Sequence, residues 1–203
     1  MNTFCIKQEH LDKDNFYVGK EDLSNYQGHI VAQENLGIIR FKNSLRSSGN
    51  IYFRAGNGIQ AGEGIEAGGG IVAGWGILAG GGIKAGEGIV AGGGIKAGGG
   101  IKAGEGIEAG GGIQAGWGIV AGKGIEAGLG IVCKLELSSK LRIFAGLATW
   151  KIPTKEEMQI KVGKLVQGQV CYGELIETGL PKEDCCDGKV VEIEGKKYQL
   201  KAI

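Results

Sequence analysis

Isoleucine recurs at every sixth position through the middle of the chain, in an unbroken run of thirteen from Ile59 to Ile131. Each unit reads Ile-x-Ala-Gly-x-Gly, and the phase continues through Phe53 before the run and through Leu137 and Ile143 after it. Residues two apart in an extended chain face the same side. We therefore predict that each hexapeptide forms a short strand, with Ile and Ala facing inward, followed by a Gly-x-Gly corner.

Glycine makes up 42 of the 203 residues, whereas there are only 2 prolines. A collagen helix is excluded because it needs Gly at every third position and abundant Pro. Disorder is disfavoured because 42% of the residues are hydrophobic and recur on a strict period. Glycine at the corners permits positive φ at no steric cost, and we expect stacking of the coils to offset the conformational entropy that the glycines lose on folding.

The sixfold period and the inward aliphatic residue resemble the hexapeptide-repeat β-solenoids, whose three short strands per coil form a triangular prism. Left-handed members of that family place a small residue two positions before the aliphatic one, whereas here Ala follows it by two. The sequence leaves open three hexapeptides per coil or two, because Trp75 and Trp117 are separated by a multiple of six but of neither twelve nor eighteen. A third packing, a bundle of polyproline-II-like helices, is disfavoured because the pattern has no break for chain reversals.

The predicted fold class is thus all-β, a single-stranded parallel β-solenoid with additions at both ends. We expect an N-terminal cap with irregular opening coils over 1–52, the solenoid over 53–149, and a small α+β or β module for capping and interaction over 150–203. In that module Thr154 and Glu157 form a capping box, which predicts a helix through the apolar residues after it: Met158, Val162, Leu165 and Val166. The alternating pattern of residues 190–200 predicts a hairpin.

Charge and hydropathy limit the partners and the cellular location that we expect for the protein. Lys and Arg number 23 against 22 Asp and Glu, so a net charge of +1 gives no reason to expect a nucleic-acid partner. The chain has no apolar run of membrane-spanning length, and its first ten residues turn polar early, so we expect no membrane association and a cytoplasmic location. The 5 cysteines are odd in number and irregularly spaced, which favours reduced thiols.

The resemblance suggests acyltransferases and zinc-dependent carbonic anhydrases, but the residues for that chemistry are missing. Those enzymes use histidines at the coils, and this chain has only His10 and His29, both outside the array. We therefore expect no enzyme activity and no cofactor. A zinc site is not expected either, because four residues near the C-terminus lack the spacing of zinc ligands: Cys171, Cys185, Cys186 and Asp187. Cys133 occupies an Ala position and is predicted to be buried. The glycines do not form a phosphate-binding loop, and the Thr ladders of ice-binding solenoids are missing.

Function is then expected on the outer surface, where large apolar side chains stand on a rigid Gly/Ala scaffold. The candidate binding residues are Trp75, Leu78, Trp117, Leu129 and Trp150. An alternative is that the tryptophans pack within the solenoid or beneath the terminal segments.

We expect a non-catalytic solenoid that binds a protein partner, with self-association as a further use of the same surface. A small, chemically inert repeat protein also resembles the accessory products of phages and mobile elements that block host defence complexes, such as anti-CRISPR inhibitors. One alternative is a self-assembling scaffold similar to the bactofilin filaments. Another is a degenerate hexapeptide acyltransferase.

Overall fold

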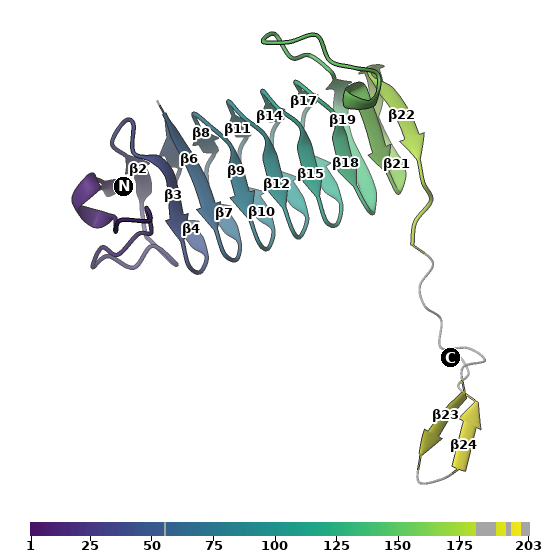
Figure 1. Ribbon diagram of the computed structural model, residues 1–203, viewed down its shortest axis with the longest axis horizontal. Coiled ribbons are helices and arrows are strands. Elements are labelled where there is room, and N and C mark those ends of the chain that lie inside the picture. Colours follow the sequence, from purple (N-terminus) through teal and green to yellow (C-terminus); the bar gives the residue numbers. More distant parts are fainter. Residues whose placement is uncertain (55, 182–189, 194–195, 200–203) are drawn as a thin grey trace.

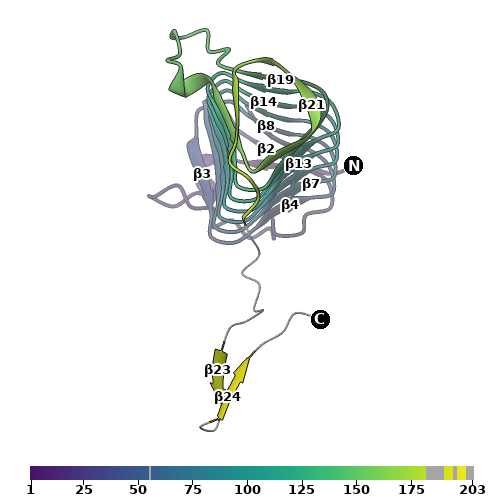
Figure 2. The ribbon, with the colours of Figure 1, turned by 90° about the vertical axis from the view of Figure 1, so that its right-hand side faces the viewer.

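The protein is a parallel β-solenoid whose coils stack along one axis (Figure 1). The computed structural model describes residues 1–54, 56–181, 190–193 and 196–199. Viewed along the axis, the coils are roughly triangular and form three faces (Figure 2). The predicted all-β solenoid is confirmed.

Each coil of the array contains three hexapeptides. Ile83 pairs with Ile65 in the preceding coil and with Ile101 in the next, so equivalent residues are eighteen positions apart. The corners are paired as well, since the backbone N–H of Glu105 donates to the carbonyl oxygen of Glu87 at 3.2 Å. The two-hexapeptide coil and the polyproline-II bundle are therefore wrong.

The strands divide among three faces, each a ladder of parallel strands one coil apart. Face A consists of β1 (Thr3–Ile6), β2 (His29–Ala32), β5 (Ile51–Phe53), β8 (Ile71–Ala73), β11 (Ile89–Ala91), β14 (Ile107–Ala109), β17 (Ile125–Ala127) and the second half of β19 (Glu136–Ala145). Face B consists of β4 (Leu45–Ser47), β7 (Ile65–Ala67), β10 (Ile83–Ala85), β13 (Ile101–Ala103), β16 (Ile119–Ala121) and the first half of β19. Face C consists of β3 (Gly37–Phe41), β6 (Asn57–Ala61), β9 (Ile77–Ala79), β12 (Ile95–Ala97), β15 (Ile113–Ala115), β18 (Ile131–Cys133), β20 (Gln159–Val162) and β22 (Glu174–Glu177). Strand β21 (Lys164–Tyr172) runs beside β19 across faces B and A.

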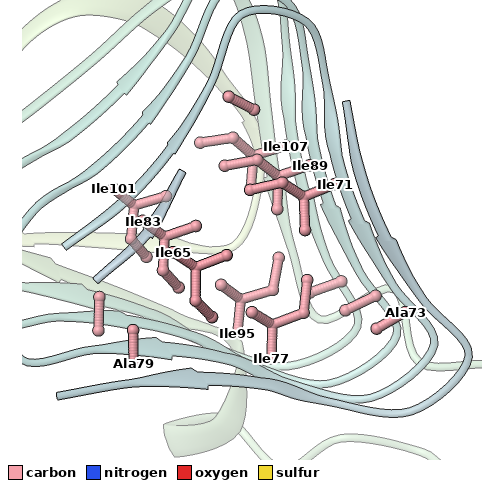
Figure 3. Packing of buried hydrophobic residues seen from close by; sticks show 14 of the residues in the cluster. Ile65, Ile71, Ala73, Ile77, Ala79, Ile83, Ile89, Ile95, Ile101 and Ile107 are labelled. Atoms are coloured by element: carbon pink, nitrogen blue, oxygen red, sulfur yellow. The ribbon is translucent and has the colours of Figure 1, made fainter. Parts of the chain in front are cut away.

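The core is built from three isoleucine ladders, one from each face, that meet along the axis (Figure 3). The array isoleucines are at most 1% exposed, and each contributes about 1.5–3 kcal/mol by burial. Leu137 and Ile143 continue the ladders and are 0% exposed, as their phase predicts. Phe53 is also 0% exposed, but it pairs with Ala73 while Ile51 pairs with Ile71, so the sixfold phase does not extend to Phe53 as predicted. The periodic positions therefore supply one continuous apolar core.

The glycines of the array do not use the positive φ that glycine permits at the corners. None of those between residues 58 and 130 lies in the left-handed region. The glycine after each alanine is required by close packing instead. A Cβ at Gly86 would lie 1.9 Å from the carbonyl oxygen of Gly68, and one at Gly98 would lie 2.0 Å from that of Gly80. Glycine is therefore needed at this position because successive coils approach closely, and not because of positive φ.

Residues 8–28 connect β1 to β2 and begin with a short 3-10 helix, η1 (Gln8–His10). Phe16 and Tyr26 form parallel bridges to Arg40 of β3 and Ser47 of β4, which places this segment over the first strands of faces C and B. Leu11 and Leu23 of this segment are buried. Four rings pack together above the core: Phe4, His10, Tyr17 and Tyr26.

The segment after residue 150 contains strands where the sequence predicts a helix. The capping box is present, since the N–H of Glu157 donates to Thr154 Oγ1 at 3.4 Å and the N–H of Thr154 to Glu157 Oε2 at 3.1 Å. It opens only a 3-10 turn, η2 (Glu156–Met158), after which β20, β21 and β22 extend the same sheets. The helix prediction is wrong because the residues after the turn follow the alternation of a strand, with Ile160 and Val162 buried and Lys161 between them exposed.

At the C-terminus, β23 (Val190–Ile193) and β24 (Lys196–Gln199) pair antiparallel, as the predicted hairpin requires. The assignment of 150–203 to capping and interaction stays a prediction. Among the described residues, no helix is long and apolar enough to cross a membrane.

Candidate protein-binding surface

Each hexapeptide presents two side chains to the outside, one between Ile and Ala and one at the corner between the two glycines. Stacking turns these positions into rows that run along the solenoid axis. Between a corner row and the next strand row lie only a glycine and the backbone of a buried isoleucine, so each face carries a longitudinal groove. The chemistry of a groove is then set by the two rows beside it.

One corner row carries three large apolar side chains, more than either of the other two rows. The edge between faces A and C, here called the Trp75 edge, consists of Trp75, Gly93, Gly111, Leu129 and Leu147, each one coil after the last. The Trp75 side chain is 50% exposed and that of Leu147 is 42% exposed. Trp75 and Leu129 lie three coils apart, which is about 14 Å at the spacing of neighbouring strands.

A protruding loop, residues 146–158, adds further apolar groups to the Trp75 edge. The loop leaves the solenoid at the corner between faces A and C (Figure 2). Trp150 folds back along this edge, where its Nε1 donates to the carbonyl oxygen of Gly110 at 3.3 Å. Trp150 remains 64% exposed, and Ile152 is 94% exposed. The loop therefore extends the Trp75 edge outward with two apolar side chains.

The groove on face C lies beside the Trp75 edge and has a volume of about 530 Å³. Its floor is formed by Gly76, Gly94, Gly112 and Gly130, and Leu78, Val132 and Leu129 are among its walls. At its C-terminal end, the groove is lined by Glu156, Glu157 and Gln159. Among the described residues, nothing donates a hydrogen bond to Gln159 Oε1. Along its length the groove also has polar side chains, Gln60, Lys96 and Gln114, and Lys161 lies with the acceptors at its end.

The five predicted binding residues divide between two places. Trp75, Leu129 and Trp150 share the Trp75 edge, and Leu78 lies in the adjoining groove. Trp117 is 65% exposed on the edge between faces C and B, because its separation from Trp75 equals two coils and one further hexapeptide. Both array tryptophans are therefore exposed side chains and not part of the core.

Sequence reasoning missed the contribution of the 146–158 loop. Leu147 could have been found from its phase, since it comes one coil after Leu129. Ile152 and Gln159 had no periodic signal, because their positions depend on how the loop leaves and re-enters the solenoid.

The two histidines considered for catalysis, His10 and His29, accept hydrogen bonds from backbone N–H groups. His10 Nδ1 accepts a hydrogen bond from the N–H of Lys7, and His29 Nδ1 accepts one from the N–H of Asn50. Cys133 is buried as predicted, and burial raises the pKa of its thiol to about 11.

The thiols considered for zinc lie partly beyond the described residues. Cys171 is an exposed thiol on β21, whereas Cys185, Cys186 and Asp187 fall outside the part that the structure describes. Within that part, no three His, Cys, Asp or Glu side chains are grouped to hold a metal ion.

Comparison with known proteins found no match: no family model, no curated protein and no solved structure is similar to the chain at a significant level.

Proposed function

We propose that the chain is a non-catalytic protein-binding solenoid whose partner docks on the Trp75 edge and the adjoining groove of face C. The observation that carries this proposal is the gathering of the exposed Trp75 and Trp150 with the partly buried Leu129 on one edge of a rigid scaffold. Tryptophan is enriched among the residues that dominate binding energy. The scaffold is stiff because every coil is hydrogen-bonded to its neighbours, so little order is lost when a partner docks.

The partner surface should match this chemistry. Its centre would be apolar, to cover the indoles and leucines, and a donor group would reach the acceptors at the end of the groove, Glu156, Glu157 and Gln159. We further propose that the partner belongs to a host defence complex, in the manner of anti-CRISPR proteins. That finer proposal rests on the small size of the chain and its lack of recognisable catalytic residues.

The repeat itself supplies the variants for a test. Trp75→Gly and Leu129→Gly introduce the residue found at the equivalent corners, Gly93 and Gly111, so the fold should be kept. We expect each to weaken binding of a partner purified from the native host by about 30-fold, equivalent to about 2 kcal/mol. The matched control is Trp117→Gly, which makes the same change on another edge and should leave this affinity unchanged.

The measurement is titration calorimetry with the purified partner, and circular dichroism verifies the fold of each variant. Equal affinity of the Trp75→Gly variant and the unmodified chain would show that the Trp75 edge is not the docking site. A partner unrelated to host defence, or no rescue of phage plating by the chain, would remove the finer proposal alone.

A further inference from the structure

The groove on face B differs in charge from the other two. It has a volume of about 560 Å³ and a floor of Gly64, Gly82, Gly100 and Gly118. The strand row beside it reads Arg46, Glu66, Lys84, Lys102 and Val120, one residue per coil. This strand row thus has three cations and one carboxylate, and the corner row on the other side of the groove begins with Glu63. On face A, by contrast, the charged residues lining a groove are all acidic: Glu105, Glu108 and Glu126.

The cations of face B are only partly used within the chain. Lys84 Nζ lies 2.7 Å from Glu66 Oε1, an exposed pair one coil apart. Lys102 is exposed and is in no ion pair among the described residues. Arg46 is also exposed, at the far end of the groove. The groove therefore has a net positive charge that a ligand could neutralise.

The opposite end of the same groove is apolar. Trp117, Val120 and Leu135 line it and are 65%, 41% and 37% exposed. The corner positions alongside Lys84 and Lys102 are Gly81 and Gly99, so the groove is open there on its corner side. A ligand can thus place a large apolar side chain at this end and lie extended toward the cations.

We propose that the groove of face B binds an extended acidic polypeptide segment with one large apolar anchor residue. The anchor sits among Trp117, Val120 and Leu135, and carboxylates continue from it toward Lys84 and Arg46. Coils repeat at about 4.8 Å and an extended chain advances about 3.4 Å per residue, so acidic residues would lie about three and six positions from the anchor. This site lies on another face and does not depend on the function proposed for the Trp75 edge.

An acidic polypeptide is favoured over nucleic acid. Affinity for a phosphate backbone comes from neutralising many charges at once, and here three cations share their row with Glu66. The apolar end matches one aliphatic or aromatic side chain between Trp117 and Leu135.

The test uses the full chain and a labelled peptide with a central Leu and Glu at three and six positions on both sides, so that either direction of binding is accepted. Fluorescence anisotropy should show saturable binding that weakens as salt rises. We expect Lys102→Glu to weaken binding at least tenfold. Lys96→Glu, the same change at the same repeat position on face C, is the control and should alter it less than twofold. Trp117→Gly should also weaken binding at least tenfold.

Several outcomes would overturn the proposal. They are the absence of saturable binding, equal losses for Lys96→Glu and Lys102→Glu, or equally tight binding of a peptide with Lys in place of each Glu. Tighter binding of an oligothymidylate that is lost in Lys102→Glu would assign the groove to nucleic acid instead. Circular dichroism confirms that each variant keeps its β-sheet content.

Discussion

Two glycines of one hexapeptide differ in the space that a Cβ atom would have. A Cβ at Gly86 would lie 1.9 Å from a backbone oxygen of the preceding coil, whereas one at Gly88 would meet its nearest neighbour at 3.4 Å. We expect Gly86→Ala to lower the free energy of unfolding by about 3 kcal/mol, because hydrogen-bonded coils must move apart. Gly88→Ala should change it by no more than about 0.5 kcal/mol. Urea unfolding monitored by circular dichroism measures both, and similar losses for the two variants would contradict the close-packing explanation.

Residue identity predicted the inside of the solenoid better than its corners. The burial of Ile and Ala could be predicted from the period alone, and Cys133 is buried because it occupies an Ala position. The role of Gly86 could not be predicted, because its constraint is a contact with Gly68, eighteen residues earlier. Asn57 gave no signal at all, yet it is fully buried, and its Nδ2 donates to the carbonyl oxygens of Gln33 and Arg54.

At the scale of elements, the number of hexapeptides between two residues decides whether they share an edge. Deleting residues 83–100 removes one whole coil and keeps Trp75 and Leu129 on the Trp75 edge. Deleting residues 83–94 removes two hexapeptides and moves them to different edges. Both variants should fold, because the units are interchangeable, but only the shorter deletion should abolish partner binding. Calorimetry with the same partner is the measurement, and loss of binding in both variants would argue against an edge-based site.

Element type was predictable where the period is strict and failed where it ends. The capping box of Thr154 and Glu157 is real, but a box specifies only how a turn begins. The course of the chain after this turn is decided by the open end of the sheets, whose unpaired strands accept β20, β21 and β22. Only part of the candidate site could be predicted from the sequence. Trp75 and Leu129 could be named as candidates, but the number of residues per coil was needed to place them on the same edge.

The whole molecule has two unlike ends. At the first, residues 8–28 bridge to β3 and β4, and Ile6 is 0% exposed. At the other, β21 and β22 form the last described coil of the solenoid (Figure 2). There Leu175 is 38% exposed, although Ile160, one coil below it, is 0% exposed.

This asymmetry predicts a gradient of local stability. Amide hydrogen exchange should be fastest in β21 and β22 and slowest in the middle of the array, with β1 and β2 still well protected. Mass spectrometry of proteolytic fragments measures this order. Equal protection at the two ends would mean that the N-terminal segment adds nothing to the stability of the first coil.

The two ends of the array also give it a mechanical direction. Tension applied at the C-terminus acts first on β21 and β22, the last coil that the structure describes, so coils would detach one at a time, each releasing about 60 Å of chain. A cellular unfolding motor that grips this terminus would meet a series of small barriers. One that grips the N-terminus would first have to strip away a packed cluster of aromatic rings.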